Sequence, residues 1–511
     1  MVSLVGVKSN KENQPQKSYH SYYTTLSCGL QVAMWNRIEK ILSRFANQFS
    51  RKAAYKWFVT IITGLMIRSD KLGVTSVIRD LRLKPNTYVP MMHFFRADSW
   101  KLNEIRKCWH ITARQELPLL RKGGRPVLVG DGVKNSKEGR HMPGVKRLAQ
   151  ESETQSKPEF IYGHMWGCVG VLLGSARNLF CTPLTLRIHD GLQGMKKWAG
   201  ANISDDSHVV QLVKDACQVA QSFEENCLLL LDRYFLSVPA LAELKRQNGQ
   251  NIRQIDIITK AKRTIIAYEL PPERKPGTRG APRKKGDRVK LMELFDTRKQ
   301  SFRRKKLRLY GKKERVQYYC IDLLWGQKLY QKLRFVLVEY SGTKSILAST
   351  DLSLDPKTII SLYGRRYRIE FSFREMKQQL GAFSYRFWTK AFPRLNHYKK
   401  KTDPDPLQAV TIESEQQRIL NTVRATEMYA LMSCIAMGIL HALAYNLDPT
   451  WLQLMRYQRT PARQVPSEAN IMGCLRQTII PILSQHLDHE IPRLIYSLQV
   501  HFDDLCGSEA A

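Results

Sequence analysis

The sequence predicts an α/β protein in which a sheet covered on both faces is interrupted by a β-rich insertion and flanked by helical regions. Between about residues 125 and 251, short apolar runs typical of buried strands alternate with amphipathic helical stretches. Residues 252–350 break this alternation with three further strand-like runs. The chain before residue 123 and after residue 357 has mainly helical periodicity.

Charge gives the first indication of function. The 511 residues include 81 Lys and Arg against 45 Asp and Glu, a formal net charge of +36. A surface with this excess attracts polyanions, of which nucleic acid is the commonest. A ribosome-associated protein and a membrane-surface protein are the alternatives. The hydrophobic share of 43% supplies a large core and excludes a wholly disordered chain.

Other features favour a reducing, cytoplasmic location. The ten Cys contain no CxxC pair and no Cys/His cluster at zinc spacing, and the first thirty residues lack a secretory signal. Residues Met428–Leu447 are long and apolar enough to span a bilayer, but they contain polar residues and lack a flanking basic cluster. We therefore expect a buried core helix there and no membrane partner.

Composition and periodicity divide the chain into five regions. They are a flexible arm (1–25), a helical DNA-binding region (26–122), a catalytic core (123–251 and 351–392), a β-rich basic insertion (252–350) and a helical C-terminal region (407–511). Within the insertion, residues 274–315 hold 18 Lys and Arg against four Asp and Glu. This stretch either follows a DNA backbone or forms a solvated charged loop.

Two predicted buried strands each end in an aspartate. Val127-Leu-Val-Gly leads to Asp131, and Leu228-Leu-Leu-Leu leads to Asp232. Functional groups gather where strands of an α/β sheet end, and carboxylates suit Mg²⁺. A single aspartate in this position is more often a turn or capping residue, so the pair raises the possibility of a metal site without establishing it.

The stretch 363–377 carries a third acid in a polar pattern. On one helix, Tyr363, Arg366, Glu370 and Lys377 fall within a stripe of roughly 60° at 100° per residue. Such an edge would place a carboxylate beside cations able to hold phosphates. A solvated helix face with Arg–Glu pairs is the alternative. Glu375 lies well off the stripe and is rejected as the third acid.

The spacing Y-x2-R-x3-E-x6-K formed by these four residues resembles the signature of bacterial insertion-sequence transposases of the DDE class, of the cut-and-paste type. The surroundings of Asp131 and Asp232 are similar to those of the two aspartates in that group. The resemblance covers about residues 125–390. It implies that Asp131, Asp232 and Glu370 are the catalytic and metal-binding triad.

The same resemblance implies a ribonuclease-H-like catalytic core with two Mg²⁺ ions, for which Mn²⁺ can substitute. The reaction would be cleavage at transposon ends followed by attack of the 3′-OH on target DNA. Tyr363, Arg366 and Lys377 would contact the transposon end. The partners would be terminal repeats, target DNA and a second subunit in a paired-end complex, in a bacterial cytoplasm with the enzyme on the nucleoid when bound to DNA.

Two further residues are candidates for contacts with DNA. Trp325 in the insertion is a candidate for holding a flipped base, although a core Trp is an alternative. Arg233 stands next to Asp232 and is a candidate DNA contact. Two other functions remain open: a nuclease of the same fold that does not transpose, and a transposase-derived DNA-binding protein without catalysis.

Overall fold

The computed structural model describes residues 32–70, 72–150, 158–175, 178–273, 280–309, 311–396, 405–446 and 465–501. The predicted flexible arm, residues 1–25, lies outside these ranges, as does Leu447 at the end of the predicted core helix.

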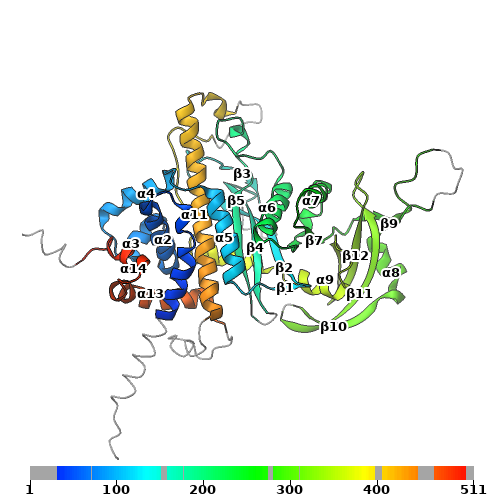
Figure 1. Ribbon diagram of the computed structural model, residues 1–511. Helices are drawn as coiled ribbons and strands as arrows, with labels where there is room; N and C mark the ends of the chain where they lie inside the picture. The colour runs from blue at the N-terminus through cyan, green and yellow to red at the C-terminus, as the bar shows by residue number, and fades with distance from the viewer. Residues whose placement is uncertain are drawn as a thin grey trace, which may run out of the picture.

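One large sheet runs through the molecule (Figure 1). Its strands are β1 (Arg121–Lys122), β2 (Arg125–Ser136), β3 (Lys146–Ala149), β4 (Phe160–Gly174), β5 (Leu179–Ile188), β6 (Cys227–Leu231), β7 (Ile255–Lys260), β8 (Ile266–Tyr268), β9 (Arg288–Lys290), β10 (Arg303–Leu309), β11 (Lys312–Trp325), β12 (Gln331–Tyr340) and β13 (Thr343–Ser349). The strand order is β3-β4-β2-β6-β7-β13-β12-β11-β8-β9, with β5 beside β4, β10 beside β11 and β1 beside β2.

The centre of the sheet contains its only parallel pairs among the described strands. β6 pairs in parallel with β2 on one side and with β7 on the other, whereas β4 and β5 are antiparallel additions next to β2. All five residues of β6 are buried, as expected for an uninterrupted apolar strand covered on both faces. The predicted mixed α/β class is therefore confirmed, with a large, mostly open sheet.

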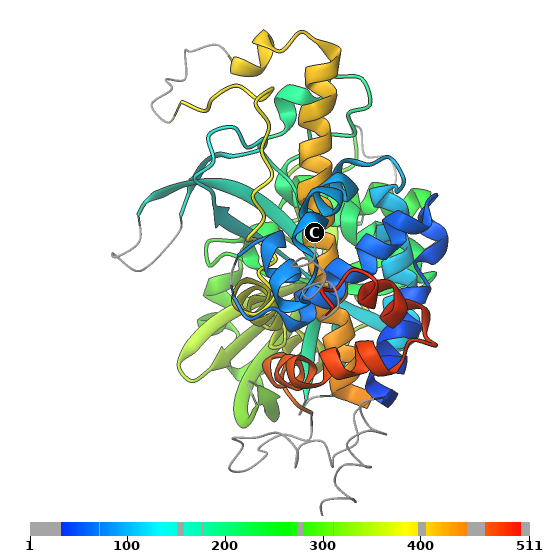
Figure 2. The same cartoon turned by 90° about the vertical axis from the view of Figure 1, so that its left-hand side faces the viewer.

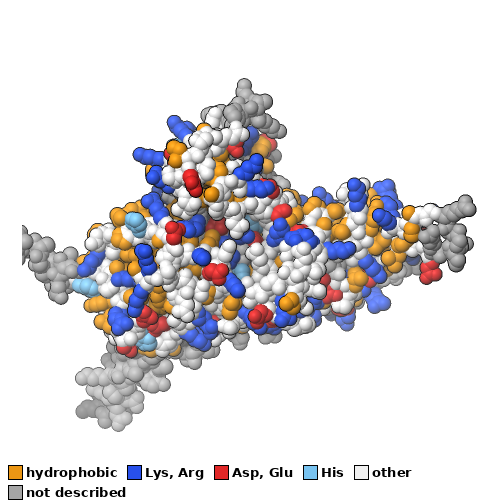
Figure 3. All heavy atoms as spheres, turned by 45° about the horizontal axis from the view of Figure 1, so that its top comes forward, with side chains coloured by type: hydrophobic (Ala, Val, Ile, Leu, Met, Phe, Trp, Pro, Cys, Tyr) orange, Lys and Arg blue, Asp and Glu red, His pale blue; other side chains and the backbone are white. Residues whose placement is uncertain are grey.

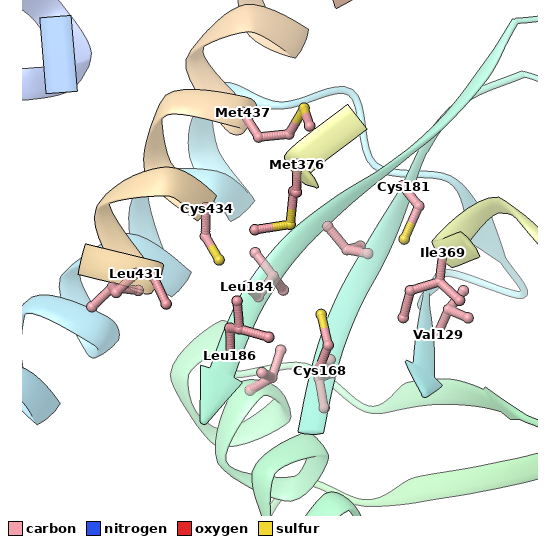
Figure 4. Packing of buried hydrophobic residues seen from close by; sticks show 14 of the residues in the cluster. Val129, Cys168, Cys181, Leu184, Leu186, Ile369, Met376, Leu431, Cys434 and Met437 are labelled. Atoms are coloured by element: carbon pink, nitrogen blue, oxygen red, sulfur yellow. The ribbon is translucent and has the colours of Figure 1, made fainter. Parts of the chain in front are cut away.

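Helices cover both faces of this central part. On one face lies α6 (His208–Phe223), with α7 (Val238–Gln250) packed against it. On the other face lie α10 (Arg368–Gln378) and α11 (Glu413–Asn446). Figure 4 shows Met376 of α10 and Cys434 and Met437 of α11 pointing into one apolar layer over β4 and β5.

The insertion continues the sheet. The predicted boundary at residue 252 assigns Ile255–Thr259 to the insertion, but β7 pairs with β6 in parallel and with β13 in antiparallel. β7 is thus shared by the core and the β-rich part, and the hydrogen-bonded ladder passes from one to the other without a break. The short helix α8 (Leu294–Thr297) lies within the insertion, and α9 (Pro356–Tyr363) follows it and packs against β10, β12 and β13.

The N-terminal and C-terminal helical regions form one helical body around α11 (Figure 2). Its N-terminal part contains a helix over 32–43, then α2 (Lys52–Ile67), α3 (Val74–Asp80), α4 (Tyr88–Arg96) and α5 (Leu102–Glu116). Its C-terminal part contains α13 (Glu468–Gln485) and α14 (Glu490–Tyr496), both of which pack against α2. The sequence predicts the two regions as separate units, since local periodicity does not reveal contacts between residues hundreds of positions apart.

Helix α11 passes through the centre of this body. Of the described helices it is the one long and apolar enough to cross a membrane, but 94% of its most apolar window is buried inside the protein. The prediction of a core helix at Met428–Leu447 agrees with this placement. At Gly438 the helix passes close to α5, because a Cβ atom there would lie 2.1 Å from the Trp109 indole.

Replacing Gly438 with alanine should destabilise the fold by about 1–3 kcal/mol, since the added methyl overpacks a rigid contact with buried Trp109. The measurement is the free energy of unfolding in urea. Gly473→Ala in α13 is the matched control, because no atom lies within 4 Å of its Cβ position. The control should be neutral or more stable by up to about 1 kcal/mol. Equal effects of the two changes would contradict this account of α11.

Candidate active site

Parallel pairing brings the two strand-end aspartates to one edge of the sheet. The register aligns Val129 of β2 with Leu230 of β6, and continuing it by two residues places Asp131 beside Asp232. Asp131 lies within β2, and Asp232 follows β6 directly. The Thr259 hydroxyl of β7 donates to the carbonyl of Asp232 over 2.9 Å, which fixes the backbone at this point.

Glycines flank Asp131 because side chains packed on the opposite face of β2 lie close to the backbone there. A Cβ at position 130 would meet the Leu231 and Leu212 side chains at 2.7 and 2.8 Å, and one at position 132 would meet those of His208 and Met165, each at 2.7 Å. Leu212 and His208 belong to α6, which therefore packs closely on the β2 backbone. The pattern Gly130-Asp-Gly132 was the available sequence signal for this close approach, and the sequence reasoning missed it.

The segment with the third acid is not one helix. Helix α9 ends at Tyr363, residues 364–367 form turns, and α10 begins at Arg368. The single helical stripe proposed for Tyr363, Arg366, Glu370 and Lys377 is therefore wrong as geometry. The turns nevertheless bring Tyr363, Arg366 and Glu370 to the aspartates, because the chain folds back over the strand ends.

Arg366 connects two of the three acids. Its Nη1 lies 3.0 Å from Oδ2 of Asp131 and its Nη2 lies 2.5 Å from Oε1 of Glu370. The Tyr363 hydroxyl donates to Oδ1 of Asp232 over 3.4 Å. Residues from two strands and from the 356–378 segment thus meet around one guanidinium.

Burial and repulsion between the acids set the electrostatics. The pKa of Asp131 is raised to about 6: burial is the largest cause, Arg366 acts in the opposite direction, and the charges of Asp232 and Glu370 add to the rise. Burial alone would lower the pKa of Arg366, but the charges of Asp131 and Asp232 outweigh burial and raise it. The cluster therefore favours a cation at its centre.

The donor chemistry fits a hard divalent cation, since all three acids offer carboxylate oxygens. In the described part of the chain, however, no three His, Cys, Asp or Glu side chains are close enough together to hold a metal ion. The Arg366 guanidinium lies between Asp131 and Glu370 and contacts both. A metal ion bound by these acids requires Arg366 to give up its two carboxylate contacts.

The other three residues predicted to contact DNA have different surroundings. Arg233 is exposed in the turn after Asp232. Lys377 is exposed near the end of α10, with its ammonium 5.8 Å from the Phe383 ring centre. Trp325 ends β11 and is partly buried against the core, which is the environment expected for a core Trp.

A buried polar chain lies behind β2, on the α6 side. His208, which packs against Gly132, has its Nδ1 2.9 Å from Nδ1 of His189. The Nε2 of His189 lies 2.8 Å from Asp215, and Asp215 also pairs with Arg187 at 2.9 Å. Nothing in the spacing of these residues indicated the chain, because they come from β5, α6 and the loops between them.

The fold and the acid cluster define an α/β protein with carboxylates collected at the ends of parallel strands. A family model described as DDE superfamily endonuclease matches residues 44–315, just over half of the 511 residues. The chain therefore belongs to the DDE superfamily of endonucleases, whose domains generally use divalent metals. The match includes Asp131 and Asp232 and ends before Glu370. No curated protein and no solved structure is significantly similar to the chain.

The Arg366–Asp131 contact should contribute a coupling free energy of about 1–3 kcal/mol, because both side chains are largely buried, with exposed fractions of 14% and 22%. A double-mutant cycle with Arg366→Gln and Asp131→Asn measures it from urea unfolding in EDTA. The Arg374–Glu375 pair is the control, since its arginine is 52% exposed and its coupling should stay below about 1 kcal/mol. A coupling near zero for Arg366 and Asp131 would argue against the site described.

His208 should lower the free energy of unfolding in mild acid. Burial, and next the charge of His189, lower its pKa to about 3, so the folded protein keeps it neutral. As the pH falls from 7 to 5, the unfolded chain binds a proton that the folded chain does not bind. The free energy of unfolding should therefore fall by about 1–2 kcal/mol from this residue alone.

Comparison of wild type with His208→Asn isolates that contribution, because other titrating groups cancel in the difference. Urea unfolding at pH 5, 6 and 7 should give a steeper dependence for wild type. Parallel curves for the two proteins would mean that His208 is protonated in the folded state.

Proposed function

We propose that the chain is a DNA transposase of the DDE class that cleaves transposon ends and transfers the freed 3′-OH to target DNA. One observation carries this proposal. Asp131, Asp232 and Glu370 are separated by 101 and 138 residues in sequence, yet they meet through Arg366 and Tyr363 of the 363–370 segment.

The topology supports a ribonuclease-H-like core. The order β5-β4-β2-β6-β7 joins an antiparallel group of three strands to two strands parallel to β2. The proposed acids stand on the first and fourth strands of this group along the chain, and on a helix that follows the sheet. This is the placement that the resemblance implies for the catalytic core.

The proposed mechanism assigns roles to five side chains. Asp131, Asp232 and Glu370 would hold two Mg²⁺ ions, or Mn²⁺ in their place, which activate the attacking water or hydroxyl and stabilise the leaving oxygen. Tyr363 orients Asp232 through its hydroxyl. Arg366 neutralises the acids in the free enzyme and is positioned to transfer its hydrogen bonds to a DNA phosphate.

Exposed basic residues of the insertion supply a second DNA contact in this proposal. β10 is an edge strand paired only with β11 among the described strands. The hairpin carries the exposed cations Arg303, Arg304, Lys305, Lys306, Arg308, Lys312 and Lys313. Figure 3 shows Lys and Arg side chains spread over one face of the molecule, including the insertion at its right-hand end. Such a surface binds the DNA backbone without reading sequence.

The partners in this proposal are the terminal repeats, target DNA and a second copy of the chain, in a bacterial cytoplasm. A nuclease of the same fold would share the acids and differ in forming no strand-transfer product. A DNA-binding derivative would bind the ends without cutting them.

Purified protein with Mg²⁺ should cut a plasmid carrying the gene and its native flanks at the ends of the element. Asp232→Asn and Glu370→Gln should each reduce cleavage by at least a hundredfold, because each removes a proposed metal ligand. Sequencing gels of the cut ends and of target-joined products provide the measurement. Glu375→Gln, the same change five residues along α10, is the control and should cleave like wild type.

Discrete cuts without joined products would support the nuclease. DNA binding without cutting, equal in all four proteins, would sink the assignment of the three acids.

A further inference from the structure

A groove away from the acid cluster is lined by three distant parts of the chain. Helix α4, the extended residues 386–390 and the first half of α11 enclose a volume of about 670 Å³. Figure 2 shows the segment after α10 running alongside α11 toward the start of that helix. Sequence reasoning could not reveal this groove, because its walls are joined only by the fold.

The groove has a strong positive charge that no acid compensates. Arg96, Arg386, Lys390 and Arg418 line it, and its lining contains no Asp or Glu. All four side chains are exposed, and within the described ranges none of them forms an ion pair with a carboxylate.

The cavity between α5 and α6, about 700 Å³ in volume, is different. Three of its cations are paired with acids: Arg187 lies 2.9 Å from Asp215, Lys214 2.5 Å from Asp206 and Arg106 3.4 Å from Glu427. Those charges are satisfied within the protein, whereas the cations of the α4–α11 groove are available to an external polyanion.

Two aromatic rings stand exposed among these cations. Tyr88 is 44% exposed and Trp388 is 54% exposed, and both line the groove. Large aromatic side chains exposed next to unpaired cations are the combination by which proteins bind single-stranded nucleic acid: the cations hold phosphates and the rings stack on bases.

We propose that the α4–α11 groove binds a single strand of DNA, with its phosphates held by the cations of the groove and bases stacked on Trp388 and Tyr88. Its volume is that of a small-molecule pocket, so it suits a short stretch of a single strand better than a full duplex. The choice of DNA rests on the proposed function, since the groove chemistry by itself defines a single-stranded polynucleotide.

The groove is tied to the strand that carries Asp131. The Lys137 ammonium, at the end of β2, donates to the carbonyls of Phe383 (2.5 Å) and Tyr385 (3.0 Å). These two residues immediately precede the groove wall at 386–390. A DNA strand bound there would be held by the same structural unit as the acid cluster, which suits a strand unpaired near the cleaved phosphate.

The test uses full-length protein and fluorescence anisotropy with a labelled single-stranded 20-mer and a blunt duplex. Arg386→Glu with Arg418→Glu should weaken single-strand binding at least tenfold. The change should also reduce the slope of log affinity against log salt by about 1.4, since each lost phosphate contact contributes about 0.7. Trp388→Ala should weaken binding about five- to tenfold with an unchanged salt slope, because it removes stacking alone.

Lys245→Glu with Arg253→Glu is the matched control. These residues are exposed on α7 and the loop before β7, outside the groove lining, and the double change alters net charge by the same amount. It should leave single-strand binding within twofold of wild type.

The outcomes separate this proposal from the proposed function. Unchanged single-strand binding in the groove variants, with wild type still cutting DNA in Mg²⁺, would overturn the groove and leave the transposase intact. Equal losses for single strand and duplex would overturn the single-strand specificity. Tight binding of a single-stranded RNA 20-mer but not of the DNA would overturn DNA as its ligand. Wild type that neither binds nor cuts DNA would overturn both proposals.

Discussion

Three carboxylates gathered at the ends of neighbouring strands repel one another, and the site depends on a cation that offsets this repulsion. In the free chain that cation is the Arg366 guanidinium, which contacts Asp131 and Glu370. The contact has two consequences for the fold. It fastens the 363–370 segment to the strand ends, and it keeps half-buried Asp131 paired with an opposite charge although burial and neighbouring acids raise its pKa to about 6. Sheet, turns and helix α10 are thus joined at their most charged point.

Local patterns predicted much of the fold, and the resemblance to the transposase signature pointed to the members of the acid cluster. The apolar runs before Asp131 and Asp232 predicted β2 and β6, because five or so consecutive buried residues leave few alternatives to a covered strand. The motif residues Tyr363, Arg366 and Glu370 were identified by spacing, and the structure brings them to the two aspartates. The helix assumed for them was wrong at 364–367, where turns replace it, because tertiary contacts outweigh helical periodicity over a single turn.

Other features could not be predicted because they depend on contacts between distant residues. The sharing of β7 between the core and the insertion is decided by its pairing with β6 on one side and β13 on the other, and periodicity does not reveal pairing partners. The joining of the two terminal helical regions depends on α2 meeting α13 and α14. The same limit applies to the charge excess of +36, which composition reveals only as a sum. In the fold this excess divides into internally paired clusters, such as Arg187 with Asp215, and unpaired surfaces on the insertion hairpin and the α4–α11 groove.

The unbroken ladder from β6 through β7 to β13 also has a mechanical meaning. An insertion joined by two flexible linkers could move relative to the core, whereas this one is hydrogen-bonded to the core as part of one continuous sheet. A ligand bound by the β10–β11 hairpin is consequently held at a fixed distance from Asp131 and Asp232. In the proposed cleavage of DNA, the flexibility that brings the scissile bond to the acids would come from the substrate, so DNA that bends or opens easily near the cut would be favoured.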